Sequence, residues 1–196
     1  MKNKDNGVKY IFTRGLTLTF TGFIFNMMAL PVLSIPSPFW SVLISIAIML
    51  LFYYVVFVFG RMSGEHCFKA YKRNLLRIKQ GESISKSQKL LEYHWSKGFL
   101  FSAIYYIWQI ILLVIALIIR NKALNLIISY YNLAFANILN TTEIIQKMGD
   151  TSSYNALFFI VIIIVPLIFE AGFVLSGEKL KKQHQEIKME IRMFNS

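Results

Sequence analysis

The sequence has little of what soluble enzymes and secreted domains depend on. It holds one cysteine, Cys67, which excludes an internal disulfide and a Cys-x-x-Cys metal pair. Only 16% of its residues are charged, against ~25% in an average soluble domain, and 10 acidic residues face 21 lysines and arginines. No HExxH, GxSxG, GxxxxGK or GxGxxG motif occurs. With 56% hydrophobic residues, these absences exclude a soluble globular enzyme, a disulfide scaffold and a disordered tail.

Long apolar segments are what the chain does have. Four of them, together 85 residues, contain a single charged residue, Glu170. A helix of ~20 apolar residues spans the ~30 Å hydrocarbon core of a bilayer. The sequence therefore predicts an all-α integral membrane protein, one membrane domain over residues 1–196 with four transmembrane helices. The predicted spans cover residues 15–33, 39–60, 98–119 and 156–177.

Lysines and arginines are unevenly distributed around these spans. Residues 1–14, 61–97 and 178–196 carry 18 of the 21, and residues 120–155 carry the other three. Because excess Lys and Arg remain in the cytoplasm, we expect a multi-pass plasma-membrane protein with both termini and residues 61–97 on the cytoplasmic side. The net charge of +11 is interpreted as this topological signal and not as a sign of nucleic-acid binding.

A further apolar stretch, residues 123–139, bears on the number of spans. Its polar residues Asn125, Ser129 and Asn132 share one helical face. We expect an interfacial or re-entrant helix on the outer side, because this keeps the Lys-rich tail inside. The alternative is a complete fifth span, which would place that tail outside.

The segment 61–97 has the features of a cytoplasmic helical hairpin. Its first arm ends at Gly81, and Ser85 and Gln88 form a capping box that opens a second helix running toward Lys97. Apolar residues are expected to join the two arms: Leu75, Leu76, Ile78, Leu90, Leu91 and Trp95.

The first arm also carries a basic patch. We expect it to face solvent and the anionic lipids of the inner leaflet, with about 1 kcal/mol of attraction for each charge near the surface. The patch consists of Lys69, Lys72, Arg73, Arg77 and Lys79. The tail 178–196 is predicted to continue the last span as an amphipathic helix.

Glu170 is the main candidate for a functional side chain. An acid inside a span is costly unless paired, and such residues often mark ligand or ion sites. Polar residues of other spans are its candidate partners: Asn26, Tyr105 and Gln109. Polar residues at helical spacing are more often helix-packing contacts, and Glu170 would then be protonated and hydrogen-bonded to a neighbouring helix. Both interpretations stay open.

Catalytic and metal-binding residues are not assigned, and no cofactor is expected. His66 and Cys67 are adjacent and point about 100° apart on a helix, which does not suit one metal ion. A pairing of Cys67 with His94 at the cytoplasmic face is the one conceivable arrangement for a thiol enzyme.

Two stretches carry a likeness to known proteins. They are Arg73-Asn74-Leu75 through Lys97-Gly98 into a span, and Pro166 followed by residues 172–179, where a Gly- and Phe-containing span end precedes lysine. This order resembles uncharacterised small polytopic membrane proteins of Gram-positive bacteria and implies no activity. The length is also similar to that of the substrate-binding subunits of energy-coupling-factor vitamin transporters. Those have about six helices, whereas four or five can be drawn here.

These observations predict a non-catalytic protein, a small accessory or structural subunit of a transport-related membrane complex. Its expected partners are the lipid bilayer, anionic inner-leaflet lipids and a membrane-protein partner or a second copy of the chain, and not nucleic acid. The alternative is a small-solute or ion binding or transport protein centred on Glu170, and a membrane-embedded enzyme is the third possibility.

Overall fold

The computed structural model describes residues 7–119, 134, 138 and 151–194. Throughout these residues the chain is helical or irregular, and no strand occurs in them, which confirms the all-α class. The elements are α1 (Gly7–Met28), the 3-10 helix η1 (Pro31–Ser34), α2 (Pro38–Lys79), α3 (Lys86–Leu90), α4 (Lys97–Ile119) and α8 (Thr151–Phe194). Apart from Ala134 and Ile138, the predicted interfacial helix 123–139 lies outside the described residues.

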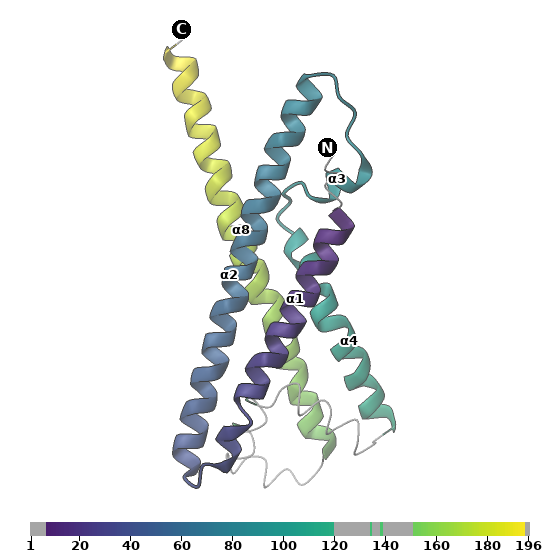
Figure 1. The fold of residues 1–196 in the computed structure, drawn as a ribbon, viewed down its shortest axis with the longest axis vertical. Helices are drawn as coiled ribbons and strands as arrows, with labels where there is room; N and C mark the ends of the chain where they lie inside the picture. The colour runs from purple at the N-terminus through teal and green to yellow at the C-terminus, as the bar shows by residue number, and fades with distance from the viewer. Residues whose placement is uncertain (1–6, 120–133, 135–137, 139–150, 195–196) are drawn as a thin grey trace.

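The four long helices alternate in direction. Figure 1 shows α1 and α4 running one way and α2 and α8 the other, so the start of α1 and the end of α8 lie at the same end. We call it the hairpin end, because it also holds residues 80–97. Among the described residues, two helices are long and apolar enough to cross a membrane: α2, and α4 over Lys97–Ile115.

The first helix differs from its predicted span. α1 begins at Gly7 and ends at Met28, earlier than the predicted 15–33. Pro31 lacks a backbone N–H and opens η1, where the chain turns toward α2. The local sequence, and not the apolar run, therefore sets where this helix stops.

Two helices are about twice as long as a membrane span requires. α2 has 42 residues and α8 has 44, or ~63 and ~66 Å at 1.5 Å per residue. The first hairpin arm is thus the uninterrupted continuation of α2, and it stops before Gly81, whose φ of 79° only glycine adopts readily. The tail continues α8, as predicted.

Small residues allow α2 and α8 to cross closely. A Cβ at Gly60 would overlap the carbonyl oxygen of Phe169, and one at Gly172 would overlap that of Phe57. Further along, Ser176 Oγ donates to the Arg61 carbonyl at 2.9 Å. This crossing joins Gly60-x-x-x-Gly64 to Gly172-x-x-x-Ser176, two motifs of small residues at helical spacing that are typical of close helix packing.

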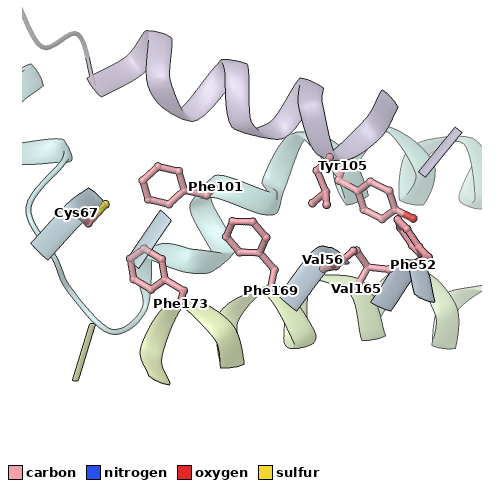
Figure 2. Packing of buried hydrophobic residues seen from close by; sticks show 9 residues of the cluster. Phe52, Val56, Cys67, Phe101, Tyr105, Val165, Phe169 and Phe173 are labelled. Atoms are coloured by element: carbon pink, nitrogen blue, oxygen red, sulfur yellow. The ribbon is translucent and has the colours of Figure 1, made fainter. Parts of the chain in front are cut away.

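Aromatic side chains fill the space between the helices. Phe101 of α4 lies 5.7 Å from Phe173 of α8 between ring centroids, and Phe52 lies 6.3 Å from Tyr105. The cluster extends from Phe52 to the wholly buried Cys67 at the hairpin end (Figure 2). The four long helices therefore share one core.

The hairpin differs from its prediction in its second arm. The capping box is present: Gln88 N donates to Ser85 Oγ at 3.3 Å, and Ser85 N donates to the Gln88 side chain at 3.0 Å. However, α3 ends at Leu90, where the Lys97 ammonium donates to the carbonyls of Lys89, Leu90 and Glu92 at 2.7–3.2 Å. These bonds satisfy the last carbonyls of α3 without a longer helix.

Three of the six apolar residues expected to join the two arms lie on the surface instead. Leu76, Ile78 and Trp95 are 56–60% exposed, and of the six predicted contact residues only Leu91 is buried. The buried Asn74 makes the connection instead, donating to Glu92 Oε1 at 2.9 Å and to the Gln88 carbonyl at 3.2 Å. A polar side chain on α2 therefore connects the two arms of the hairpin.

Candidate functional site

Glu170 lies where α8 passes the first turn of α4. Its residue surface is 8% exposed, and a Cβ at Gly98 would overlap its Oε2. Glycine at this position therefore lets the carboxylate approach the α4 backbone. The amides of a first helical turn have no partner within their helix, and that end carries ~+0.5 of a charge. The carboxylate thus faces the positive end of the α4 dipole.

Hydrogen bonding leaves this carboxyl group unsatisfied. Neither Oε1 nor Oε2 of Glu170 has a hydrogen-bond partner among the described residues. The backbone N–H of Phe99 interacts with the carboxyl group but falls short of a full hydrogen bond. A buried acid of this kind can hold a proton or accept a hydrogen bond from a ligand.

The other residues proposed for this site lie elsewhere. Tyr105 and Gln109 follow Gly98 on α4 by two and three turns, ~10 and ~16 Å along the axis. The ring of Tyr105 lies 3.0 Å from the position of a Cβ on Gly22, and Asn26 is one turn beyond Gly22 on α1. The structure therefore brings Tyr105 and Gln109 toward the α1 residues and not toward Glu170.

Three polar side chains of the apolar helices donate hydrogen bonds within their own helices, while Gln109 Oε1 is buried without a partner among the described residues. The amides of Asn26 and Gln109 donate to the carbonyls four residues earlier, those of Gly22 and Tyr105, at 2.9 and 3.0 Å. Ser102 Oγ donates to the Gly98 carbonyl at 3.1 Å in the same way. Such bonds reduce the cost of a hydroxyl or amide in a lipid environment and require no polar cavity.

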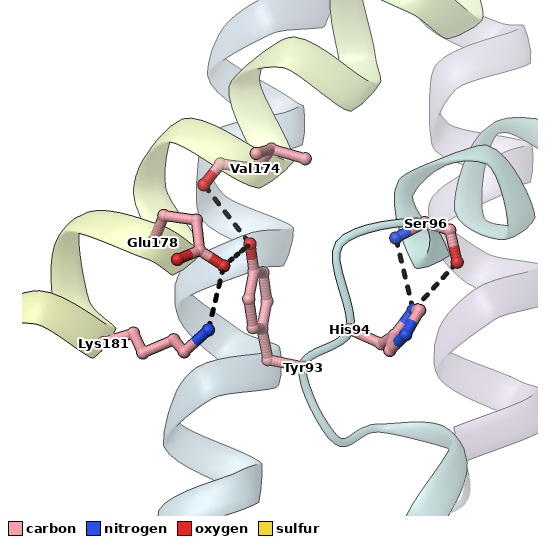
Figure 3. Close-up of polar contacts among 6 residues, drawn as sticks. All are labelled: Tyr93, His94, Ser96, Val174, Glu178 and Lys181. Atoms are coloured by element: carbon pink, nitrogen blue, oxygen red, sulfur yellow. Dashed lines mark hydrogen bonds and ion pairs between the residues drawn. The ribbon is translucent and has the colours of Figure 1, made fainter.

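Tyr93 ties the hairpin to α8. Its hydroxyl donates to Glu178 Oε1 at 3.3 Å and to the Val174 carbonyl at 3.4 Å, while Glu178 also accepts from Lys181 at 3.5 Å (Figure 3). The ring fills the space that a side chain at Gly177 would need. Burial, followed by the charge of Glu178, raises the pKa of Tyr93 above its ordinary value, so the phenol remains a donor at neutral pH.

An open cleft of about 320 Å³ lies beyond this contact, between α2, residues 93–95 and α8. Its walls are mostly aromatic, and Trp95 is 60% exposed. The lining residues are Phe68, Tyr71, Tyr93, His94, Trp95, Glu178, Lys181, His184 and Gln185. We call it the aromatic cleft.

The five predicted basic-patch residues lie on the part of α2 that follows Phe68, but Arg73 and Arg77 point ~120–180° away from the cleft residues Phe68 and Tyr71. At 100° per residue they fall within ~160° of the helix circumference, and the 60% exposed Leu76 lies among them. Lys72 Nζ lies 5.7 Å from the ring centroid of Phe68, a cleft residue. We call this set, Lys69, Lys72, Arg73, Arg77 and Lys79, the basic stripe.

The proposed thiol–imidazole pair is not formed. Cys67 is 0% exposed, whereas His94 lies on the surface with its Nδ1 2.9 Å from Ser96 Oγ. His66 stacks on Tyr10 with ring centroids 4.2 Å apart. Within the described part of the chain, no three His, Cys, Asp or Glu residues are grouped so that they could hold a metal ion.

Three features of this region were not predicted from the sequence. The Gly60-x-x-x-Gly64 motif was visible as a spacing signal of helix crossings. Neither the approach of Gly98 to Glu170 nor that of Tyr93 to Gly177 has a local signal, because more than 70 residues separate the partners.

Comparison of the chain with protein families, with curated proteins and with solved structures finds no match.

Proposed function

We propose that this chain is a four-span protein of the cell membrane, with both termini in the cytoplasm, and a non-catalytic accessory subunit of a membrane complex. One observation carries the proposal. α2 and α8 continue far beyond their apolar segments, and the continuation of α2 carries exposed basic and apolar residues beside an open cleft. A surface of this kind suits contact with another protein.

The bundle interior supports the same role. Among the described residues, aromatic side chains pack between the four helices, and the amides of Asn26 and Gln109 donate to carbonyls of their own helices. The four apolar segments fall on α1, α2, α4 and α8, whose alternating directions match four crossings with both ends on one side (Figure 1). A transport connection is part of the proposal through the buried acid Glu170 alone.

Isolation of the native complex tests this role. The tagged chain, expressed at its natural level and extracted in mild detergent, should co-purify with a stoichiometric membrane protein and migrate well above its 22.8 kDa mass. A chain that remains monomeric in several mild detergents, with no cross-linked partner in cells, would contradict the accessory role.

A second function is favoured by Glu170 itself. Both of its carboxylate oxygens are buried without a hydrogen-bond partner among the described residues, as in a site that binds an ion, a proton or a small solute. Glu170→Gln should then leave expression and thermal stability nearly unchanged while uptake or binding falls. If Glu170→Gln and Glu170→Leu both retain full activity, the binding-site interpretation fails.

A further inference from the structure

The aromatic cleft is built from three parts of the chain that lie far apart in the sequence. Phe68 and Tyr71 come from α2, Tyr93 and Trp95 from the segment before α4, and Glu178 and Lys181 from α8. Its volume of about 320 Å³ falls at the lower end of the ~300–1,000 Å³ found for small-molecule sites. Such sites combine apolar or aromatic walls with a few polar groups, and this cleft has both.

The walls of the cleft favour a positively charged group. The face of an aromatic ring carries partial negative charge and attracts a cation within ~6 Å of its centroid. Lys72 Nζ lies 5.7 Å from the ring centroid of Phe68, so this wall already holds one cation. Tyr71 and Trp95 are 37% and 60% exposed, so their rings remain accessible to a ligand. An anion alone would gain nothing from these ring faces.

Glu178 adds a negative charge to the same walls and is the only acidic residue that lines the cleft. Tyr93 and Lys181 both bond to its Oε1, at 3.3 and 3.5 Å, whereas Oε2 has no hydrogen bond within the described part of the chain (Figure 3). A carboxylate has about four acceptor positions, so Glu178 can face a further positive group. A purely apolar ligand would remove water from this carboxylate without replacing it.

Lys181 places a positive charge next to this carboxylate. The two side chains are 52% and 38% exposed and lie 3.5 Å apart, which makes them a loose pair of solvated groups. A ligand with charges of both signs can face Glu178 with its cation and Lys181 with its anion. Methyl groups on the cation would contact the aromatic walls, which a metal ion cannot do.

We propose that the aromatic cleft binds an alkylated ammonium group joined to a phosphate, the chemistry of phosphocholine. The ammonium group lies against Trp95 and Tyr71 with Glu178 as its counter-ion, and the phosphate faces Lys181. This group occurs free in water and as the headgroup of phosphatidylcholine, and the cleft begins where the apolar segment of α8 ends, at Gly177. The proposal goes beyond the accessory role and does not depend on it.

Phosphocholine itself is the probe, and the full chain is placed in nanodiscs of phosphatidylglycerol, which contains no choline. Saturation-transfer NMR titration compares it with 3,3-dimethylbutyl phosphate, which has the same shape without the positive charge, and with choline, which lacks the phosphate. We expect phosphocholine to bind at least tenfold more tightly than the uncharged analogue and at least threefold more tightly than choline. Nanodiscs of phosphatidylcholine identify the source: weaker phosphocholine binding there indicates the lipid headgroup, and equal binding indicates the free solute.

Matched variants assign the contacts. Trp95→Ala should weaken phosphocholine binding at least fivefold, and Trp40→Ala, a similarly exposed tryptophan at the opposite end, should leave it unchanged. Lys181→Gln should remove the advantage of phosphocholine over choline, whereas Lys182→Gln, an exposed neighbour outside the cleft, should retain it. Glu178→Gln keeps an acceptor for the Tyr93 hydroxyl and should weaken choline and phosphocholine alike. Unchanged melting temperature and elution volume show that each variant is folded.

Several results would overturn the proposal. Equal binding of phosphocholine and its uncharged analogue means that the cleft is only an apolar surface. Equal effects of Trp95→Ala and Trp40→Ala, or of the two lysine variants, place the ligand elsewhere. If the wild-type chain binds no phosphocholine while its native complex is recovered, the assignment of the cleft is wrong and the accessory role stands. Phosphocholine binding by a chain that has no partner leaves the cleft assigned and removes the accessory role.

Discussion

At the residue scale, glycines mark the places where a neighbouring group comes closest to a helix backbone. The consequences differ with what that neighbour is. At Gly98 it is the end of a flexible side chain, the Glu170 carboxylate, whereas at Gly60 it is a backbone carbonyl, that of Phe169. A carboxylate can swing aside, but the carbonyl of a packed helix cannot.

Gly98→Ala should therefore change stability by less than about 1 kcal/mol. The methyl group displaces the carboxylate, and alanine gains up to ~1 kcal/mol over glycine in a helix. Thermal unfolding in detergent measures the effect. Glu170→Gln and the double variant complete a mutant cycle, in which the two changes should couple. Strictly additive effects would show that the groups do not touch.

Cys67 should react very slowly with thiol reagents in the folded protein. Its side chain is wholly buried in the aromatic core, so labelling by N-ethylmaleimide requires the helices to open. A control cysteine at the exposed Ser83, in a Cys67→Ser background, should label at least about a hundredfold faster. Comparable rates for both positions would contradict the packing at the hairpin end.

At the element scale, the crossing of α2 and α8 organises the bundle. These helices make the closest backbone approaches, at Gly60 and Gly64 on one side and at Gly172 on the other. Both helices continue beyond the crossing and diverge toward their ends in Figure 1. The geometry at the crossing therefore decides where the basic stripe and the aromatic cleft lie.

Gly60→Ala should destabilise the protein by about 1–3 kcal/mol, more than Gly98→Ala does. The added methyl group meets a carbonyl oxygen that the packed α8 helix holds in place. Ala47→Val, which adds apolar bulk at an exposed position of the same helix, is the matched control and should be nearly neutral. A larger loss from Ala47→Val would contradict the assigned crossing.

At the scale of the whole molecule, the proposed membrane topology can be tested by the accessibility of single cysteines. Single cysteines at Lys86 and Lys188, in a Cys67→Ser background, should resist a membrane-impermeant thiol reagent in intact cells, and one at Ser37 should react. The reason is the position of these sites: Ser37 precedes α2 at the opposite end, and Lys86 lies at the hairpin end. Labelling of the Lys188 position from outside would favour five spans.

Local sequence determined the helices and several of their ends. In lipid, a chain segment must form all of its own backbone hydrogen bonds, which only a helix or a closed barrel achieves. The apolar runs of this chain have the length of helical spans, so they indicate the all-α class. Gly81 and the Ser85–Gln88 capping box act within a few residues, and both were predictable. The end of α1 at Met28 also has a local cause, Pro31, although the apolar run extends beyond it.

Only the tertiary structure decided which residues share a site. Helical periodicity defines the faces of each helix, but not the depth or the neighbour at which a face meets another. Glu170 therefore came to lie against Gly98 and not beside Tyr105 or Gln109. The same kind of packing places the Tyr93 hydroxyl within hydrogen-bond distance of Glu178, which lies 85 positions later in the chain. The distance of the basic stripe from the apolar segment of α2 depended on this helix remaining unbroken from Pro38 to Lys79, because each residue of a continuous helix adds ~1.5 Å along its axis.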